Sequence, residues 1–75
     1  MSESDKSQDI IEITGVVKEV LPDFTFRVLL ENGILILAKG AGKLRKKRVR
    51  ISVLDNVIVE ITKYDPNRGR ISKRL

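Results

Sequence analysis

The sequence contains no cysteine and no histidine, and these absences exclude several classes of protein. Without cysteine there is no disulfide framework. Without either residue there is no zinc site of the Cys/His kind and no Cys or His nucleophile–base pair. No apolar run approaches the roughly 20 residues that a membrane-spanning helix needs. We therefore expect no cofactor and no membrane span, and an enzyme is the least favoured class.

Aromatic residues are also scarce, since the chain has only Phe24, Phe26 and Tyr64. General single-strand nucleic-acid binders stack bases on aromatic rings, so this scarcity argues against such a binder. Phe24 and Phe26 share the parity of Val28 and Leu30 and are predicted to be core residues. Tyr64 lies near a turn, where it either stacks on a base or caps the folded domain half-buried.

The 75 residues suffice for one small domain. A hydrophobic content of 41% with 33% charged residues is typical of a folded chain. Residues 1–9 are polar, with three acids against Lys6 alone, so we expect a flexible tail before one domain over 10–75. This start is neither a basic, apolar leader nor an Arg-rich transit peptide.

The formal net charge of +5 is unevenly distributed. Residues 1–38 hold three basic and seven acidic groups, a net of −4, and residues 39–75 hold twelve basic and three acidic groups, a net of +9. The acids of the first half accompany no histidine or phosphate loop, so we interpret them as solvated. Seven cations follow one another without an intervening acid: Lys39, Lys43, Arg45, Lys46, Lys47, Arg48 and Arg50. Such like charge favours a polyanionic partner, either nucleic acid or an anionic membrane surface.

The cluster over 39–50 is predicted to bind RNA, because lysine and arginine make most phosphate contacts. Arg68 and Arg70 flank Gly69, whose missing side chain lets the backbone approach RNA closely. Arg27 falls on the outer face of a predicted strand, a position from which a cation contacts an oligonucleotide. The alternative for each of these cations is a solvated surface charge.

Most of the chain has β-patterns, with strands predicted over 10–21, 24–30, 34–38, 56–62 and 70–74. Gly15 predicts a bulge in the first strand, and Asn32-Gly33 predicts a hairpin after the second. The third strand is apolar on both faces, which is typical of a strand covered on both sides.

Residues 39–47 depart from this pattern. Good helix formers follow Gly40 and Gly42, so a short helix is predicted with Leu44 as its lone apolar anchor. Residues 48–51 alternate again, with two arginines opposite two apolar side chains. Residues 65–69 are predicted to form a turn, because proline stands second among them.

Five strands with a short helix between the third and fourth must protect their edges, and closure into a Greek-key barrel does this. The OB-fold is the five-stranded barrel that places a helix at that point. We therefore predict an all-β, five-stranded OB-fold. The competitor is an SH3-like barrel, which usually lacks this helix and shows more surface aromatics.

Short motifs in a fixed order give the chain a resemblance to a known family. They are Gly15, Leu21-Pro22, Phe26-Arg27-Val28, Leu30-Glu31-Asn32-Gly33, Gly42-Lys43-Leu44-Arg45-Lys46, Arg50-Ile51, Asp55, Val59-Glu60-Ile61-Thr62, Tyr64-Asp65 and Gly69-Arg70-Ile71. In this order the chain resembles bacterial and plastid-type translation initiation factor 1 from about Ile11 to Arg74. It departs from the family's common residues at Lys39, Gly40, Arg48, Leu54 and Lys73.

The resemblance implies an OB-fold protein that binds the small (30S) ribosomal subunit at its aminoacyl (A) site, near the decoding region. There it contacts 16S rRNA and a neighbouring ribosomal protein, occludes the site and acts with initiation factors 2 and 3. It implies rRNA contacts above all from Lys43, Arg45 and Lys46. It also implies a non-catalytic protein of the cytoplasm or plastid stroma, monomeric when free and without a membrane partner.

Two other classes stay open. A cold-shock-like single-stranded RNA chaperone has the same barrel, but its interleaved Phe/Tyr/His motifs are missing from residues 24–28 and 34–37. A protein adaptor, or a basic domain at a membrane surface, also agrees with the charge.

Overall fold

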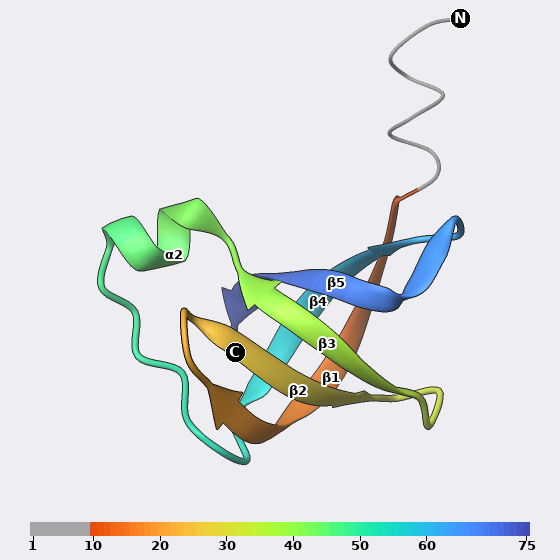
Figure 1. The fold of residues 1–75 in the computed structure, drawn as a ribbon, viewed down its shortest axis with the longest axis horizontal. Coiled ribbons are helices and arrows are strands. Elements are labelled where there is room, and N and C mark those ends of the chain that lie inside the picture. The colour runs from red at the N-terminus through yellow and green to blue at the C-terminus, as the bar shows by residue number, and fades with distance from the viewer. Residues whose placement is uncertain (1–9) are drawn as a thin grey trace, which may run out of the picture.

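The computed structural model describes residues 10–75, which form a closed barrel of five strands and one short helix (Figure 1). The elements are β1 (Ile10–Leu21), β2 (Thr25–Leu30), β3 (Leu35–Gly40), α2 (Gly42–Lys46), β4 (Asn56–Thr62) and β5 (Asp65–Arg74). The helix lies between the third and fourth strands, so the predicted OB-fold is confirmed. The tail predicted over residues 1–9 lies outside the described residues.

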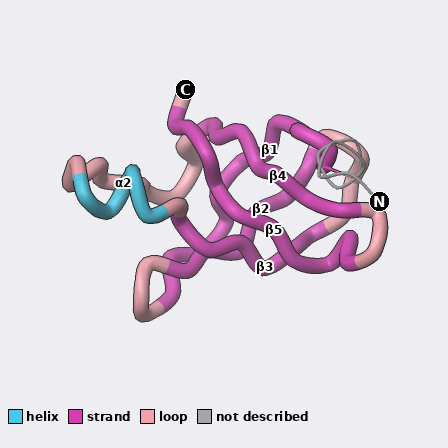
Figure 2. Tube along the Cα trace, turned by 90° about the horizontal axis from the view of Figure 1, so that it is seen from above, coloured by secondary structure: helices cyan, strands magenta, loops and turns pink. Residues whose placement is uncertain are grey.

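The barrel closes because β1 pairs with two strands. Its first part, from Ile10 to Val16, is antiparallel to β4, and its second part, from Gly15 to Leu21, is antiparallel to β2. The strand order is β1-β2-β3-β5-β4, and only the β3–β5 pair within residues 10–75 is parallel. Figure 2 shows the strands wrapped around one another, with α2 projecting at one end.

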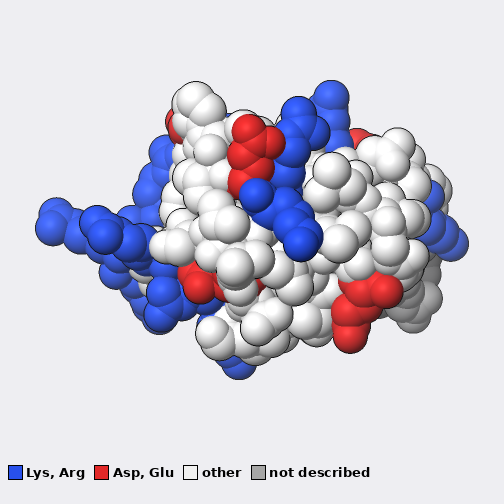
Figure 3. All heavy atoms as spheres, turned by 90° about the horizontal axis from the view of Figure 1, so that it is seen from below, with Lys and Arg blue, Asp and Glu red and all other residues white. Residues whose placement is uncertain are grey.

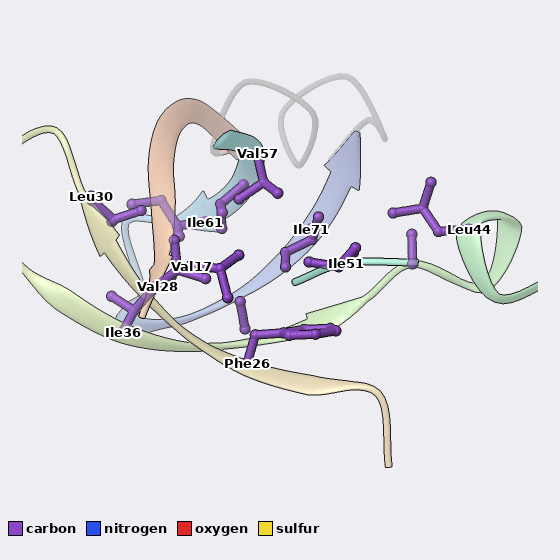
Figure 4. Close-up of a cluster of buried hydrophobic side chains, with 13 residues drawn as sticks. Val17, Phe26, Val28, Leu30, Ile36, Leu44, Ile51, Val57, Ile61 and Ile71 are labelled. Atoms are coloured by element: carbon purple, nitrogen blue, oxygen red, sulfur yellow. The ribbon is translucent and has the colours of Figure 1, made fainter. Parts of the chain in front are cut away.

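The hydrophobic core fills the barrel interior, because alternate side chains of every strand point inward. Val57, Val59 and Ile61 of β4 are all buried, as their alternation predicts. Phe26 is 2% exposed, and Leu44 under α2 is 8% exposed. Figure 4 shows these side chains converging from different strands, with Leu44 at the margin beside the helix. In the part of the chain that is described, no helix is long and apolar enough to cross a membrane.

A bulge interrupts β1, but it does not lie at Gly15. The register shifts between Val17 and Glu19, so Lys18 is the extra residue. Gly15 instead permits close approach of β2, since a Cβ there would lie 2.5 Å from Val28 Cγ1. The predicted bulge is therefore present at another residue, because the glycine serves packing.

The third strand is covered on one side only, which corrects the prediction of two covered faces. Ile36 and Ala38 are buried, whereas Leu35 is 50% and Leu37 39% exposed. A barrel has a single interior, so the outer face of β3 meets solvent.

The turn predicted over residues 65–69 is also wrong. The chain reverses at Lys63 and Tyr64, and Thr62 already pairs with Asp65. Gly69 then pairs with Ile61, so residues 66–68 form an irregularity within β5. Proline is tolerated in a strand at such a bulge.

The segment between α2 and β4 is not a strand, although its alternation holds. Ile51 is buried and Val49 packs against the core, while the two arginines of this segment are exposed. The segment returns to β1 at Leu54, whose N–H donates to the Val17 carbonyl at 2.7 Å. Leu54 has a φ of 76° and is 68% exposed.

Candidate nucleic-acid interface

One end of the barrel carries exposed cations on and after α2. We call them the helix cluster: Lys43, Arg45, Lys46, Lys47, Arg48 and Arg50. Figure 3 shows lysine and arginine gathered at the end of the molecule that carries α2, while much of the adjoining face is uncharged.

The helix cluster stands on a helix that is fixed at both ends. The Ala41 N–H donates to the Ile71 carbonyl of β5 at 2.9 Å, and Leu44 packs into the core. Arg48 ends the helix in the left-handed region, with a φ of 58°. The Val49 N–H then donates to the Leu44 carbonyl at 3.0 Å. Burial of Leu44 turns the charged side chains of α2 toward solvent.

Arg45 is oriented by the turn between β1 and β2. Its Nη2 lies 3.5 Å from Asp23 Oδ1 and donates to the Asp23 carbonyl at 3.3 Å. Its guanidinium carbon lies 5.4 Å from the centroid of the Phe24 ring. Asp23 and Phe24 both have positive φ, 63° and 54°, and a Cβ on Gly40 would collide with the Phe24 ring. Turn, aromatic ring and arginine therefore form one packed unit.

A groove of about 370 Å³ lies between this turn and the segment after α2. Phe24, Phe26 and Ile51 are among its apolar lining residues, and Arg45 and Arg50 are among its cationic ones. Unstacked bases of RNA bind to apolar and aromatic surfaces, and guanidinium groups bind phosphate bidentately. The groove therefore has the chemistry to hold a nucleotide.

A second group of cations lies on the outer side of β2, β3 and β5. We call it the barrel face: Arg27, Lys39, Arg68 and Arg70. Strand register arranges these residues in rows, since Leu37 pairs with both Arg27 and Arg68, and Lys39 pairs with Arg70. The two rows are two residues apart along the strands, about 6.6 Å, so one RNA backbone can contact both rows.

Internal carboxylates already pair with part of this charge. Arg27 Nε lies 3.2 Å from Glu19 Oε1, and Arg70 Nη2 lies 2.9 Å from Glu60 Oε1. The Arg27–Glu19 pair is exposed, and an exposed pair contributes little to stability. Glu19 remains about half exposed, so it is solvated, as expected, but it is not unpaired. Within residues 10–75, no acid pairs with these cations: Lys43, Lys46, Lys47, Arg48, Arg50 and Arg68.

Tyr64 does not join the other predicted site residues. It lies in the turn between β4 and β5, which Figure 1 places at the opposite end of the molecule from α2. Its side chain is 76% exposed, so it does not cap the barrel, and Lys63 Nζ lies 5.8 Å from the ring centroid. Its ring remains accessible for stacking, but at a separate place.

Two residues of the site escape the sequence pattern. Phe24 follows the parity of a core residue, yet it is half-buried and supports Arg45 with its ring. Asp23 follows Leu21-Pro22 and is typical of a solvated turn residue, yet it pairs with Arg45, 22 positions away. Nothing in the local sequence announces either contact, because each depends on how α2 folds back over the barrel.

Comparison with known proteins identifies the family. A family model described as translation initiation factor 1A / IF-1 matches residues 2–75. This chain belongs to that family. A curated relative, translation initiation factor IF-1 of Rickettsia bellii (strain OSU 85-389), is 52% identical over 66 residues, which are 88% of this chain and 90% of the relative.

Solved structures agree with the family. The solution structure of translation initiation factor IF-1 from the Wolbachia endosymbiont strain TRS of Brugia malayi is similar over the whole chain and 88% of its own, with 39% identity and a TM-score of 0.73. The crystal structure of YjeQ from Thermotoga maritima matches 87% of this chain but only 23% of its own, with 29% identity and a TM-score of 0.71. The same barrel thus also occurs as a small part of a much longer protein.

Membership gives the chain the role of a translation initiation factor. The family is named for that role and not for a catalysed reaction. Over the described range 10–75, no group of three or more carboxylates could hold a metal ion.

Proposed function

We propose that this initiation factor binds the small ribosomal subunit at the aminoacyl site, near the decoding region, and blocks that site during initiation. The observation that carries the proposal is the pair of basic surfaces, the helix cluster and the barrel face, on one rigid barrel. Phosphate contacts from lysine and arginine fix position on RNA, and a barrel that holds them rigidly fits folded rRNA.

In this proposal part of the binding free energy offsets the cost of distorting the RNA. The backbone of a closed barrel is already ordered, so binding phosphates costs side-chain entropy but little backbone entropy. The surplus offsets a local rearrangement of rRNA next to the factor, while the barrel itself occupies the volume that tRNA needs. A neighbouring ribosomal protein and initiation factors 2 and 3 are the protein partners, and the free factor is a monomer of the cytoplasm or plastid stroma.

The outer faces of β2 and β3 give little support to a cold-shock-like chaperone. On β2 and β3 the outward side chains include Arg27, Leu35 and Leu37, none of them aromatic. A sequence-tolerant single-strand binder needs such rings to stack bases.

The deciding experiment is co-sedimentation with vacant 30S subunits, followed by chemical footprinting of 16S rRNA. We expect stoichiometric binding and protection confined to the decoding region. Binding without protection there would overturn the assignment of the site. No binding to vacant subunits, but tight binding to short polypyrimidine, would replace the proposal with the chaperone.

A further inference from the structure

A single carboxylate joins the two basic surfaces. Asp23 Oδ2 lies 3.6 Å from Lys39 Nζ of the barrel face, and Asp23 Oδ1 lies 3.5 Å from Arg45 Nη2 of the helix cluster. The Asp23 side chain is 73% exposed, so a ligand reaches it directly. One anion held between a lysine and an arginine is the arrangement that a bound phosphate adopts.

The other paired acids differ from Asp23. Glu19 contacts Arg27, and Glu60 contacts Arg70, so each occupies one cation of the barrel face. In the described part of the chain, only Asp23 contacts a cation on each surface. Its carboxylate therefore lies at the junction of the two surfaces.

The backbone of Asp23 holds the carboxylate at this junction. Its φ is 63°, a left-handed conformation that aspartate and asparagine adopt more readily than most residues. Its carbonyl accepts hydrogen bonds from Thr25 Oγ1 at 3.1 Å and from Arg45 Nη2 at 3.3 Å. The side chain can swing away while the turn stays in place.

We propose that Asp23 is a specificity-determining residue that occupies the position of an RNA phosphate and must be displaced by one. An RNA that touches only one surface still meets the unpaired cations there, but the one cation that Asp23 already neutralises, Lys39 or Arg45, adds little to its binding. A folded RNA that places a phosphate at the junction recovers both cations at once. Asp23 thus lowers affinity for arbitrary RNA more than for a shape-matched target.

The test compares Asp23→Asn with the unaltered protein for binding to a 20-nucleotide oligouridylate, by fluorescence anisotropy over a range of salt. The inference rests on the proposed function only in that the ligand is RNA. We expect affinity at low salt to rise about three- to tenfold, which is within the range that the loss of two exposed pairs allows. The slope of log K against log salt should steepen by about 1.4, since each of two freed cations adds about 0.7.

Glu31→Gln is the matched control, because it removes the same charge from an exposed acid that has no ion pair within residues 10–75. It should leave the slope unchanged. In the double variant Asp23→Asn/Arg45→Ala the gain should fall by about half or more. An Asp23→Asn variant that behaves like Glu31→Gln overturns the proposal. If thermal unfolding shows that Asp23→Asn is misfolded, Asp23→Gly is used in its place, because glycine also adopts this positive φ.

A second arm measures specificity with vacant 30S subunits. The ratio of subunit affinity to oligouridylate affinity should fall at least threefold in Asp23→Asn. An equal rise in affinity for both ligands would overturn the role of Asp23 in specificity. It would show only that Asp23 weakens the binding of any RNA electrostatically. Failure of the unaltered protein to bind subunits would count against the proposed function, while the oligouridylate arm would still decide the role of Asp23.

Discussion

The Arg45 guanidinium carbon lies 5.4 Å from the centroid of the Phe24 ring, so an aromatic side chain from the turn before β2 supports a cation from α2. The Phe24 ring in turn packs edge-on to the buried Phe26, with centroids 5.4 Å apart. The charge of Arg45, which we propose contacts RNA, is thereby connected to the barrel core through two rings. A preorganised cation loses less freedom on binding than a mobile one.

Replacement of Arg45 by alanine should weaken small-subunit binding by about 1–3 kcal/mol, the scale of a lost charge-assisted contact. Filter binding at low salt measures the change. Lys18→Ala is the matched control, because Lys18 is an exposed cation on β1 outside both basic surfaces. Equal losses in the two variants would show that net charge alone governs binding.

Binding should depend steeply on salt. Each phosphate neutralised along a single-stranded segment contributes about −0.7 to the log–log slope, so alanine at Lys43, Arg45 and Lys46 together should reduce the magnitude of the slope by about 2. Titrations at four or more salt concentrations give the slope directly. A slope that the triple variant leaves unaltered would place the helix cluster away from the ligand.

Leu44→Ala should weaken RNA binding without removing a charge. Leu44 is 8% exposed and fixes α2 on the barrel, so its truncation should lower the free energy of unfolding by about 2–3 kcal/mol. Urea unfolding and subunit binding are measured on the same sample. The control Leu35→Ala alters a side chain that is 50% exposed and should leave stability within about 0.5 kcal/mol. Full binding by a folded Leu44→Ala protein would refute the need for a fixed helix.

Leu54→Gly should stabilise the fold by about 0.5–1 kcal/mol. Leu54 holds a φ of 76°, which costs an L-residue about 1–2 kcal/mol. Glycine removes this strain, but it also increases the entropy of the unfolded chain, which cancels part of the stabilisation. Thermal and urea unfolding report the difference. Val53→Gly, at an exposed neighbour without positive φ, should instead destabilise. A loss of stability in both variants would show that Leu54 is not strained.

Regular alternation explains which strands were predictable. β4 has the bounds expected from its sequence, because every second residue is apolar and no bulge interrupts its inner row. β5 begins five residues earlier than predicted, since Pro66 and Gly69 have the pattern of a turn. Pairing with both β3 and β4 keeps that segment extended, and no local signal reports such long-range pairing.

The candidate site divides in the same way. The helix cluster is visible in the sequence because its cations are contiguous. The barrel face is not visible as a unit, because Arg27, Lys39 and Arg68 are brought together only by strand register. Tyr64 illustrates the reverse case: it lies near Arg68 in the sequence, while the turn that holds it lies at the opposite end of the molecule from α2.

The parallel contact between β3 and β5 has a consequence for how the chain acquires its shape. β5 is the last strand in order, yet it stands between β3 and β4 in the ring. A nascent chain that still lacks β5 exposes the unpaired edges of β3 and β4, and such edges are prone to pair with other chains. The barrel can therefore close only after β5 has been synthesised. Because β5 pairs with strands far away in the sequence, the contact order is high, and folding is slower than that of a helical protein of equal length.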